Sequence, residues 1–230
     1  MADAPVFVLV HSPLVGPSTW APVAVELERR GRRVVSPSLL GPGGRLPGGW
    51  RECVEAVGVR LGPLAEPVVL VGHSGGGLLL PVIADATAQA VRGLIFVDSG
   101  IPARAGETVF APPALLEALG ALAADGILPP WSSWFGEEVM GELVPDDALR
   151  KGLMEEMPQI PMAFLEQHIP SPAGWDRSPC AYLLLSEAYG DAAAEARGRD
   201  WPVEEIEGAQ HLHIAVAPRV VTDALLRLEP

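Results

Sequence analysis

The chain contains few cysteines and no long hydrophobic run. Cys53 and Cys180 are its two cysteines, and their separation matches no metal-binding or redox motif. We therefore expect two reduced structural thiols rather than a disulfide. No apolar stretch approaches the ~20 residues that a membrane-spanning helix needs, so no membrane partner is expected.

Basic residues are also scarce, and Lys151 is the sole lysine. The chain carries 16 basic and 29 acidic residues, a formal net charge of −13. This balance argues against nucleic acid or an anionic membrane surface as a partner. The first residues lead into an expected strand without the basic and apolar regions of a signal peptide, which favours a soluble cytoplasmic protein. The sequence leaves the oligomeric state open.

Apolar residues are abundant by contrast, at 49% of the chain, which is enough for a sizeable core. Short valine-rich runs alternate with amphipathic segments, a pattern typical of parallel strands buried on both faces. The expected strands are 6–10, 34–36, 68–71, 94–97, 181–185 and 203–206, and the expected helices between and after them are 20–30, 50–61, 77–84 and 216–228. This order predicts an α/β fold with a doubly wound, mostly parallel sheet of about six strands.

The strand rhythm stops between residues 101 and 175, where proline is frequent and segments 113–124 and 145–156 favour helices. We expect an inserted helical cap here, on an α/β core formed by residues 1–100 and 176–230. The aromatic residues of the cap either form its own core or line a substrate pocket, and a lid does both. The pocket residues expected from the sequence are His11, Pro13, Trp131, Trp134 and Phe135.

The most informative motif is Gly72-His73-Ser74-Gly75-Gly76, between an expected strand and an expected helix. G-x-S-x-G in this setting is the pattern of a nucleophile elbow. The turn is tight, so the positions two before and two after the serine must be small, and glycine has no Cβ to clash. The motif predicts a nucleophilic Ser74 held above the strand ends.

A serine hydroxyl is a weak nucleophile and needs a base within hydrogen-bond reach. The chain has five histidines, and His211 is the preferred base because it follows a glycine-containing turn before the closing helix. His213 is the alternative. His73 is expected to pack inside the elbow, and His168 to be an ordinary cap histidine.

Together these features resemble the α/β-hydrolase fold superfamily over essentially the whole chain, and within it the small capped branch that includes plant methylesterases and hydroxynitrile lyases. The resemblance is carried by His11 after the first strand, the 72–76 motif, the interrupting cap, and Gly208 to His211 before the last helix. It implies a catalytic triad in the order nucleophile, acid, histidine.

The resemblance leaves two candidates for the acid. Relatives usually place it a few residues after the strand that follows the cap, where this chain has Ala188, so the neighbouring Glu187 is preferred. Other relatives place it after the strand that follows the nucleophile helix, which makes Asp98 the alternative. Either carboxylate would orient the imidazole and stabilise its charged form.

The oxyanion hole departs from the family pattern. One donor is expected to be the amide of Gly75, directly after the nucleophile. Relatives supply the other from a His-Gly-x loop after the first strand, whereas this chain has His11-Ser12-Pro13-Leu14. Proline has no N–H to donate. The second donor is then the Leu14 amide, through a shifted loop, or the Ser12 hydroxyl, or the hole is incomplete.

The sequence thus predicts a serine hydrolase that cleaves a small, mostly apolar ester, lactone or thioester through an acyl-enzyme on Ser74. No cofactor or metal is expected, because His211 and His213 lack a third ligand nearby and the glycines match no nucleotide-binding motif. The alternative is a non-hydrolytic protein of the same fold, a lyase, cyclase or ligand-binding protein, that uses Ser74 and His211 as acid, base or hydrogen-bonding groups. An acyltransferase also remains open.

Overall fold

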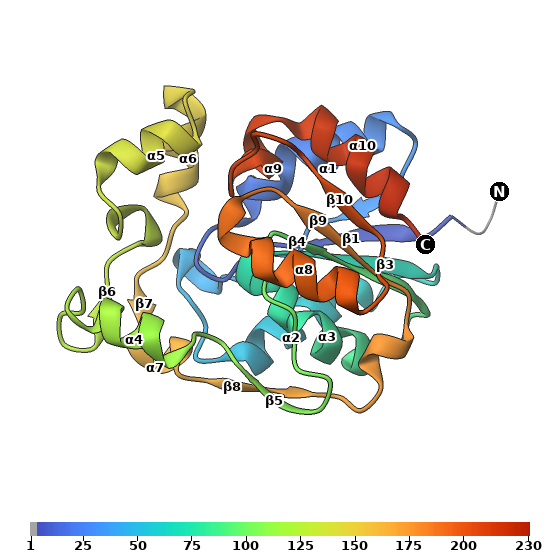
Figure 1. Cartoon of the computed structure of the whole chain (residues 1–230), viewed down its shortest axis with the longest axis horizontal. Helices are drawn as coiled ribbons and strands as arrows, with labels where there is room; N and C mark the ends of the chain where they lie inside the picture. Colours follow the sequence, from blue (N-terminus) through green and yellow to red (C-terminus); the bar gives the residue numbers. More distant parts are fainter. Residues whose placement is uncertain (1–3) are drawn as a thin grey trace.

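A parallel sheet forms the centre of the computed structural model, which describes residues 4–230 (Figure 1). Its strands are β1 (Val6–Val10), β2 (Val34–Val35), β3 (Val68–His73), β4 (Val91–Val97), β9 (Cys180–Leu184) and β10 (Val203–Glu205). The six strands lie in the order β10-β9-β4-β3-β1-β2, and all of their pairings are parallel. The α/β fold with a six-stranded parallel sheet, predicted from the sequence, is confirmed.

Helices cover both faces of this sheet. One face packs against α1 (Ala21–Arg29), α9 (His213–Val216) and α10 (Pro218–Leu228), and the other against α2 (Trp50–Leu61), α3 (Leu80–Ala86) and α8 (Gly190–Gly198). Successive side chains of a strand point to opposite faces, so a strand covered on both faces has to be apolar throughout. Every residue of β1 and β3 is buried accordingly.

The chain leaves the sheet between β4 and β9. This segment contains β5 (Gly106–Val109), α4 (Pro113–Gly120), β6 (Ile127–Leu128), a 3-10 turn η4 (Trp131–Ser133), α5 (Glu137–Leu143), α6 (Asp147–Glu155), β7 (Ile160–Pro161), α7 (Met162–Leu165) and β8 (His168–Ser171). β5 pairs with β8 and β6 with β7, both antiparallel. The sequence predicted helices alone here, because strands as short as β6 and β7 are too brief to show an alternating pattern.

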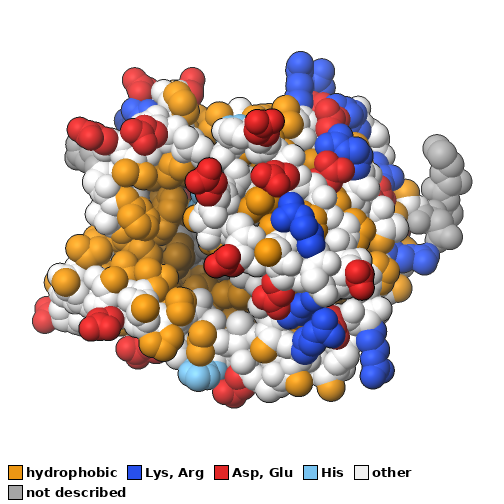
Figure 2. Space-filling model, in the orientation of Figure 1, with side chains coloured by type: hydrophobic (Ala, Val, Ile, Leu, Met, Phe, Trp, Pro, Cys, Tyr) orange, Lys and Arg blue, Asp and Glu red, His pale blue; other side chains and the backbone are white. Residues whose placement is uncertain are grey.

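Two hydrophobic clusters join this segment to the rest of the molecule. Phe110, Phe164 and Ile169 belong to the same buried cluster as Val8 and Leu70 of the sheet. The helices α5 and α6 form a separate cluster with the loop after β1 and with α9, made of Val15, Met140, Val144, Leu153, Met157, Leu212 and Ala215. Between these two attachments the surface is hollowed and lined with hydrophobic side chains (Figure 2). Within the described residues, no helix is both long and apolar enough to cross a membrane.

Candidate active site

Ser74 lies at the turn between β3 and the 3-10 helix η3 (Ser74–Leu79), which runs directly into α3. Its φ of 53° is in the left-handed region, which residues with a Cβ rarely adopt. The hydroxyl of Ser99 donates a 2.7 Å hydrogen bond to the backbone carbonyl of Ser74 and so holds this conformation. The sequence predicted an α-helix over 77–84, but the glycine run forms a 3-10 turn first, because glycine is a poor helix former.

The glycines of the motif are required by close backbone approach. A Cβ on Gly72 would lie 2.7 Å from the Cα of Gly77, and one on Gly76 would lie 2.6 Å from the carbonyl oxygens of Val10 and His11. Side-chain atoms do not fit at such distances. The positions two before and two after Ser74 therefore have to be glycine, which is the geometry of a nucleophile elbow.

Asp98 and His211 come together across the carboxyl edge of the sheet. His211 Nδ1 donates a 2.7 Å hydrogen bond to Asp98 Oδ2. Asp98 follows β4, is fully buried, and has a positive φ of 43°. It also accepts hydrogen bonds from the backbone amides of Leu185 and Ser186, both at 2.9 Å, and from the Ser186 hydroxyl at 2.5 Å.

These hydrogen bonds keep Asp98 ionised. Burial by itself raises the pKa of this carboxyl, but the hydrogen bonds and charge of His211 and the hydrogen bonds of Ser186 outweigh it and hold the pKa below its ordinary value. An ionised carboxylate on Nδ1 leaves the Nε2 atom of neutral His211 as the basic nitrogen.

Glu187, the acid preferred from the sequence, does not occupy this position. It is exposed in the 3-10 helix η6 (Glu187–Tyr189), directly after the residue that binds Asp98. The loop after β9 folds around the Asp98 carboxylate through Leu185 and Ser186, and this leaves the next side chain, Glu187, in solvent. The preference for Glu187 is therefore corrected, since the geometry brings Asp98 to His211.

Aromatic rings surround His211, whose side chain is only 17% exposed. Tyr189 stacks on it with ring centroids 5.2 Å apart and an interplanar angle of 9°. His73 and Trp131 lie at centroid distances of 4.5 and 6.0 Å. These contacts fix the plane of the imidazole. The alternative base, His213, instead accepts a hydrogen bond from the Gln210 amide through Nδ1.

His73, inside the 72–76 motif, links the elbow of Ser74 to the loop that carries His211. Its Nε2 donates a 2.9 Å hydrogen bond to the backbone carbonyl of His211. Burial, together with the neighbouring His211, lowers the pKa of His73 to about 3. The ring is therefore neutral and anchors the loop of His211 to the elbow, in line with the local packing expected for it.

His11 is not among the residues that line the cavity in front of Ser74. It is completely buried, its Nδ1 donates to the Ser12 carbonyl at 2.8 Å, and its Nε2 accepts from the Leu39 amide at 2.9 Å. Burial lowers the pKa of His11 to about 4, so the ring is neutral. Because both nitrogens are engaged, the expectation of His11 as a pocket residue is wrong, and the ring instead joins the loops after β1 and β2.

The loop after β1 lies against Gly75. A Cβ on Gly75 would meet Ser12 Oγ at 3.1 Å and Pro13 Cδ at 3.4 Å. The Leu14 amide donates a 3.3 Å hydrogen bond to Ser12 Oγ. A hydroxyl that accepts such a bond still has its own proton to donate. Of the two second donors expected from the sequence, the Leu14 amide is thus already engaged and the Ser12 hydroxyl retains a proton.

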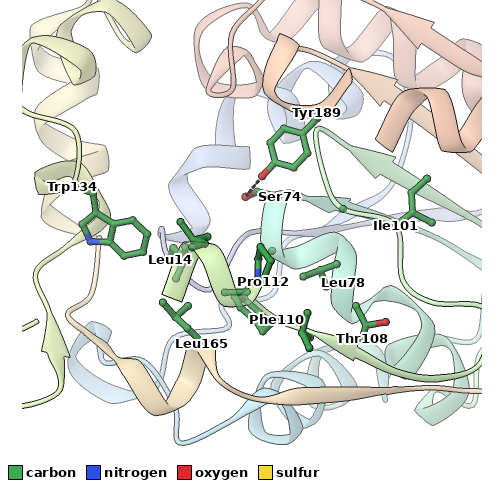
Figure 3. A pocket seen from close by; sticks show the side chains of 15 residues that line it. Leu14, Ser74, Leu78, Ile101, Thr108, Phe110, Pro112, Trp134, Leu165 and Tyr189 are labelled. Atoms are coloured by element: carbon green, nitrogen blue, oxygen red, sulfur yellow. Dashed lines mark hydrogen bonds between the residues drawn. The ribbon is translucent and has the colours of Figure 1, made fainter. Parts of the chain in front are cut away.

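A cavity of about 330 Å³ opens in front of Ser74 (Figure 3). Its lining comes from the elbow, the loop after β1, the segment after β4 and the cap, and includes Leu14, Leu78, Phe110, Leu115, Trp134 and Leu165. The polar side chains in this lining are Ser74, Thr108 and Tyr189, and none of the lining residues is charged. The cavity suits an uncharged, mostly apolar ligand.

The expected pocket residues divide accordingly. Trp134 lines the cavity, whereas Pro13 and Trp131 are outside its lining. Leu14, expected from the sequence as a possible oxyanion donor, lines the cavity as well. Trp131 packs instead on His211 and on Phe135, and Phe135 is 56% exposed. Sequence reasoning missed Ser186, Tyr189 and Phe110. Tyr189 carried one usable signal, its place just after a strand end at the catalytic edge of the sheet.

Among the side chains that the structure describes, no group of three or more His, Cys, Asp or Glu is arranged to hold a metal ion. The chemistry that this arrangement can perform rests on a serine hydroxyl, a carboxylate-bound imidazole and hydrogen-bond donors near Gly75. These are the groups that nucleophilic attack on a carbonyl group requires.

A parallel sheet with a serine on the turn after β3 and a histidine behind the last strand defines the α/β-hydrolase class. The chain belongs to the alpha/beta hydrolase family, whose model matches residues 7–224. Methylesterase 8 of Arabidopsis thaliana is 25% identical over 254 aligned positions, covering 96% of this chain and 88% of that protein. The predicted resemblance to the plant methylesterase branch is thereby confirmed.

Two further similarities involve esterases. A carbendazim hydrolyzing esterase of Nocardioides sp. (strain SG-4G) is 32% identical over 102 residues, a match that spans 42% of this chain and 42% of that enzyme. The crystal structure of polyneuridine aldehyde esterase superposes with a TM-score of 0.74 at 19% identity, covering 99% of this chain and 100% of that one. The chain is therefore an α/β hydrolase with esterase relatives.

Proposed function

We propose that this protein is a serine hydrolase that cleaves a small, mostly apolar ester, lactone or thioester through an acyl-enzyme on Ser74. The observation that carries the proposal is the 2.7 Å hydrogen bond between the buried Asp98 and His211, formed next to the Ser74 elbow. A carboxylate–imidazole pair beside an elbow serine is the arrangement that activates a hydroxyl nucleophile.

The reaction would proceed in two halves. Ser74 Oγ attacks the carbonyl carbon while His211 Nε2 accepts the hydroxyl proton, and Asp98 stabilises the imidazolium. The tetrahedral intermediate collapses to the acyl-enzyme, and His211 returns the proton to the leaving atom. Water then attacks the acyl-enzyme with His211 again as base, and Ser74 is released.

The developing negative charge on the carbonyl oxygen needs donors on the side of the loop after β1. The Gly75 amide is one, and the Ser12 hydroxyl is the second, because Pro13 has no N–H and the Leu14 amide points to Ser12 Oγ. A hydroxyl in place of a backbone amide is a workable donor, since side-chain groups form oxyanion holes in other enzymes.

The substrate class follows from the cavity. Its apolar lining and the absence of charged side chains among the lining residues favour neutral substrates that fit about 330 Å³. The esterases among the similar proteins support ester hydrolysis as the reaction type. The methylesterase resemblance favours a small alcohol as one product.

The direct test is labelling with a fluorophosphonate probe, which reacts with an activated serine. Wild type is expected to be labelled and Ser74→Ala is not. Ser38→Ala is the matched control, because Ser38 is exposed and its hydroxyl forms hydrogen bonds with the backbone of the nearby Leu40. Equal labelling of wild type and Ser74→Ala would show that the nucleophile is assigned wrongly.

The loop after β1 supports a second candidate function, that of a lyase, cyclase or ligand-binding protein of the same fold. The engaged Leu14 amide favours it, because a weak oxyanion hole suits acid–base chemistry better than acyl transfer. In that case nitrophenyl esters would not be turned over at any pH, while an apolar ligand would still bind tightly in the cavity. Turnover of short-chain nitrophenyl esters would exclude this candidate.

A further inference from the structure

Tyr189 occupies a position that the hydrolase mechanism above does not use. It ends η6, lines the cavity, and places its hydroxyl 3.5 Å from Ser74 Oγ (Figure 3). Its ring stacks flat on His211, with the ring centroids 5.2 Å apart. One side chain therefore touches both the serine and the histidine of the site.

The side from which Tyr189 approaches Ser74 is informative. The oxyanion donors lie with the loop after β1, where Ser12 Oγ and Pro13 pack against Gly75. Tyr189 comes from the opposite side, stacked on His211, and Figure 3 shows Ser74 between Tyr189 and Leu14. In a tetrahedral intermediate the oxyanion points to the hole, and the leaving group points to the histidine that protonates it.

Resting on the proposed hydrolase function, we propose that Tyr189 is a further catalytic residue, whose hydroxyl donates a hydrogen bond to the leaving-group atom of the substrate as the bond to the acyl carbon breaks. The Ser74 Oγ–carbon bond forms, the bond between the carbon and the leaving atom breaks, and the electron pair of that bond goes to the leaving atom. His211 delivers the proton that this atom keeps. Tyr189 shares its proton in a hydrogen bond and retains it.

Two properties of the free site suit this role. The 3.5 Å separation from Ser74 is longer than the ~2.7–2.8 Å typical of two bonded hydroxyls, so the Tyr189 proton is not tightly committed to the serine. Catalytic hydrogen bonds are often long before substrate binds. Burial raises the pKa of Tyr189, which keeps the hydroxyl protonated and able to donate.

The role predicts a dependence on the leaving group. Negative charge builds up on a poor leaving group, such as an alkyl alcohol, and a hydrogen bond to it is valuable. A nitrophenolate delocalises that charge over its ring and needs the donor far less. Loss of the Tyr189 hydroxyl should therefore slow alkyl esters more than nitrophenyl esters.

The test uses Tyr189→Phe in the full chain, with esters of one apolar acid whose alcohols range from nitrophenol to short alkyl alcohols. The phenylalanine ring keeps the stack on His211 and removes only the hydroxyl. For alkyl esters we expect kcat/KM to fall about 10- to 100-fold, the value of a hydrogen bond to developing charge, and for nitrophenyl esters less than about 2-fold.

Tyr182→Phe is the matched control, since Tyr182 is the other tyrosine of the chain. It is fully buried on β9 outside the cavity lining, and its hydroxyl donates to the Ser99 carbonyl at 2.7 Å. The same hydroxyl accepts a 3.1 Å hydrogen bond from the Ser99 amide, so its loss acts through Ser99, which holds the Ser74 backbone. This effect does not involve the leaving group and should lower kcat/KM by the same factor for every ester. Tyr189→Met, which also lacks the hydroxyl, repeats the measurement if the Phe variant proves unstable.

A loss that is uniform across the ester series, or no loss at all, would overturn the role of Tyr189 while leaving the hydrolase intact. If the proposed hydrolase function is wrong, the result is different: wild type would show neither fluorophosphonate labelling at Ser74 nor ester turnover. Both proposals would then be refuted. Labelling of Ser74 in Tyr189→Phe shows that the variant retains a folded site.

Discussion

Asp98 and Glu187 show what decides the role of a carboxylate. Both follow a strand at the same edge of the sheet, but Asp98 is fully buried and holds His211, whereas Glu187 is exposed. The Ser186 hydroxyl donates a further hydrogen bond, of 2.5 Å, to Asp98 Oδ2. A buried carboxylate needs such donors, because its charge has lost the hydration that water provides.

We expect Asp98→Asn to lower kcat/KM for ester hydrolysis about 10⁴-fold, because an amide no longer stabilises the imidazolium and favours the wrong histidine tautomer. Steady-state kinetics on a nitrophenyl ester measure the effect. Glu187→Gln is the matched control and should retain activity within about 2-fold, as exposed substitutions away from a site usually do. A large loss in Glu187→Gln together with an active Asp98→Asn would reverse the assignment of the acid.

At the residue scale, the sequence supports predictions where the determinant is local. Ser74 can be proposed as the nucleophile because the glycines of its motif are close neighbours in sequence, and His211 as the base because of the turn before it. The Asp98–His211 pair joins residues far apart in the chain, and which carboxylate reaches the ring depends on how the loop after β9 folds around it. That folding has no signature in the residue pattern.

At the scale of elements, β3, the turn at Ser74 and α3 form one unit that depends on close backbone contacts. A Cβ on Gly76 would lie 2.6 Å from the carbonyl oxygens of Val10 and His11 at the end of β1, so β1 and the elbow fit together only without a side chain there. The parallel strands and most helices were predictable from apolar runs and period. The two-residue strands of the cap were not, because they are defined by their partners.

Gly76→Ala is expected to destabilise the protein by about 3 kcal/mol or more, the range of severe backbone and packing clashes, and to abolish labelling of Ser74. Gly58→Ala is the matched control. Gly58 is exposed within α2, and a Cβ there would have nothing within 4 Å. It should stabilise the protein by about 0.5–1 kcal/mol through helix propensity. Urea denaturation measures both, and a stable, labelled Gly76→Ala would refute this account of the elbow.

At the scale of the whole molecule, two buried neutral histidines link stability to pH. Burial lowers the pKa of His11 to about 4 and that of His73 to about 3. In the unfolded chain both return to about 6.5, so below that pH the unfolded state binds protons that the folded state does not. The free energy of unfolding therefore decreases as the pH falls from about 6.5 toward 4.

We expect the free energy of unfolding to decrease between pH 6 and pH 5 with a slope of up to about 1.4 kcal/mol per pH unit for each histidine, or about 2.7 for the two. Urea denaturation over a series of pH values measures it. His11→Gln keeps a donor and an acceptor at that position and should remove about half of the slope. A free energy that stays flat over this range would mean that these histidines are charged in the folded protein.

Phe110 and Leu165 line the cavity in front of Ser74 and also belong to the buried cluster that joins the cap to the sheet. The cap is therefore no independent lid, because the side chains that shape the substrate cavity also hold the cap against the sheet. A substitution that enlarges the cavity at either position leaves a void in that core, at a cost of about 2–5 kcal/mol for a large-to-small change. For this protein, a substitution that admits a bulkier substrate also lowers the free energy of unfolding. Variants with a broader substrate range are therefore expected to emerge only from proteins that already carry a stabilising substitution at a site such as Gly58.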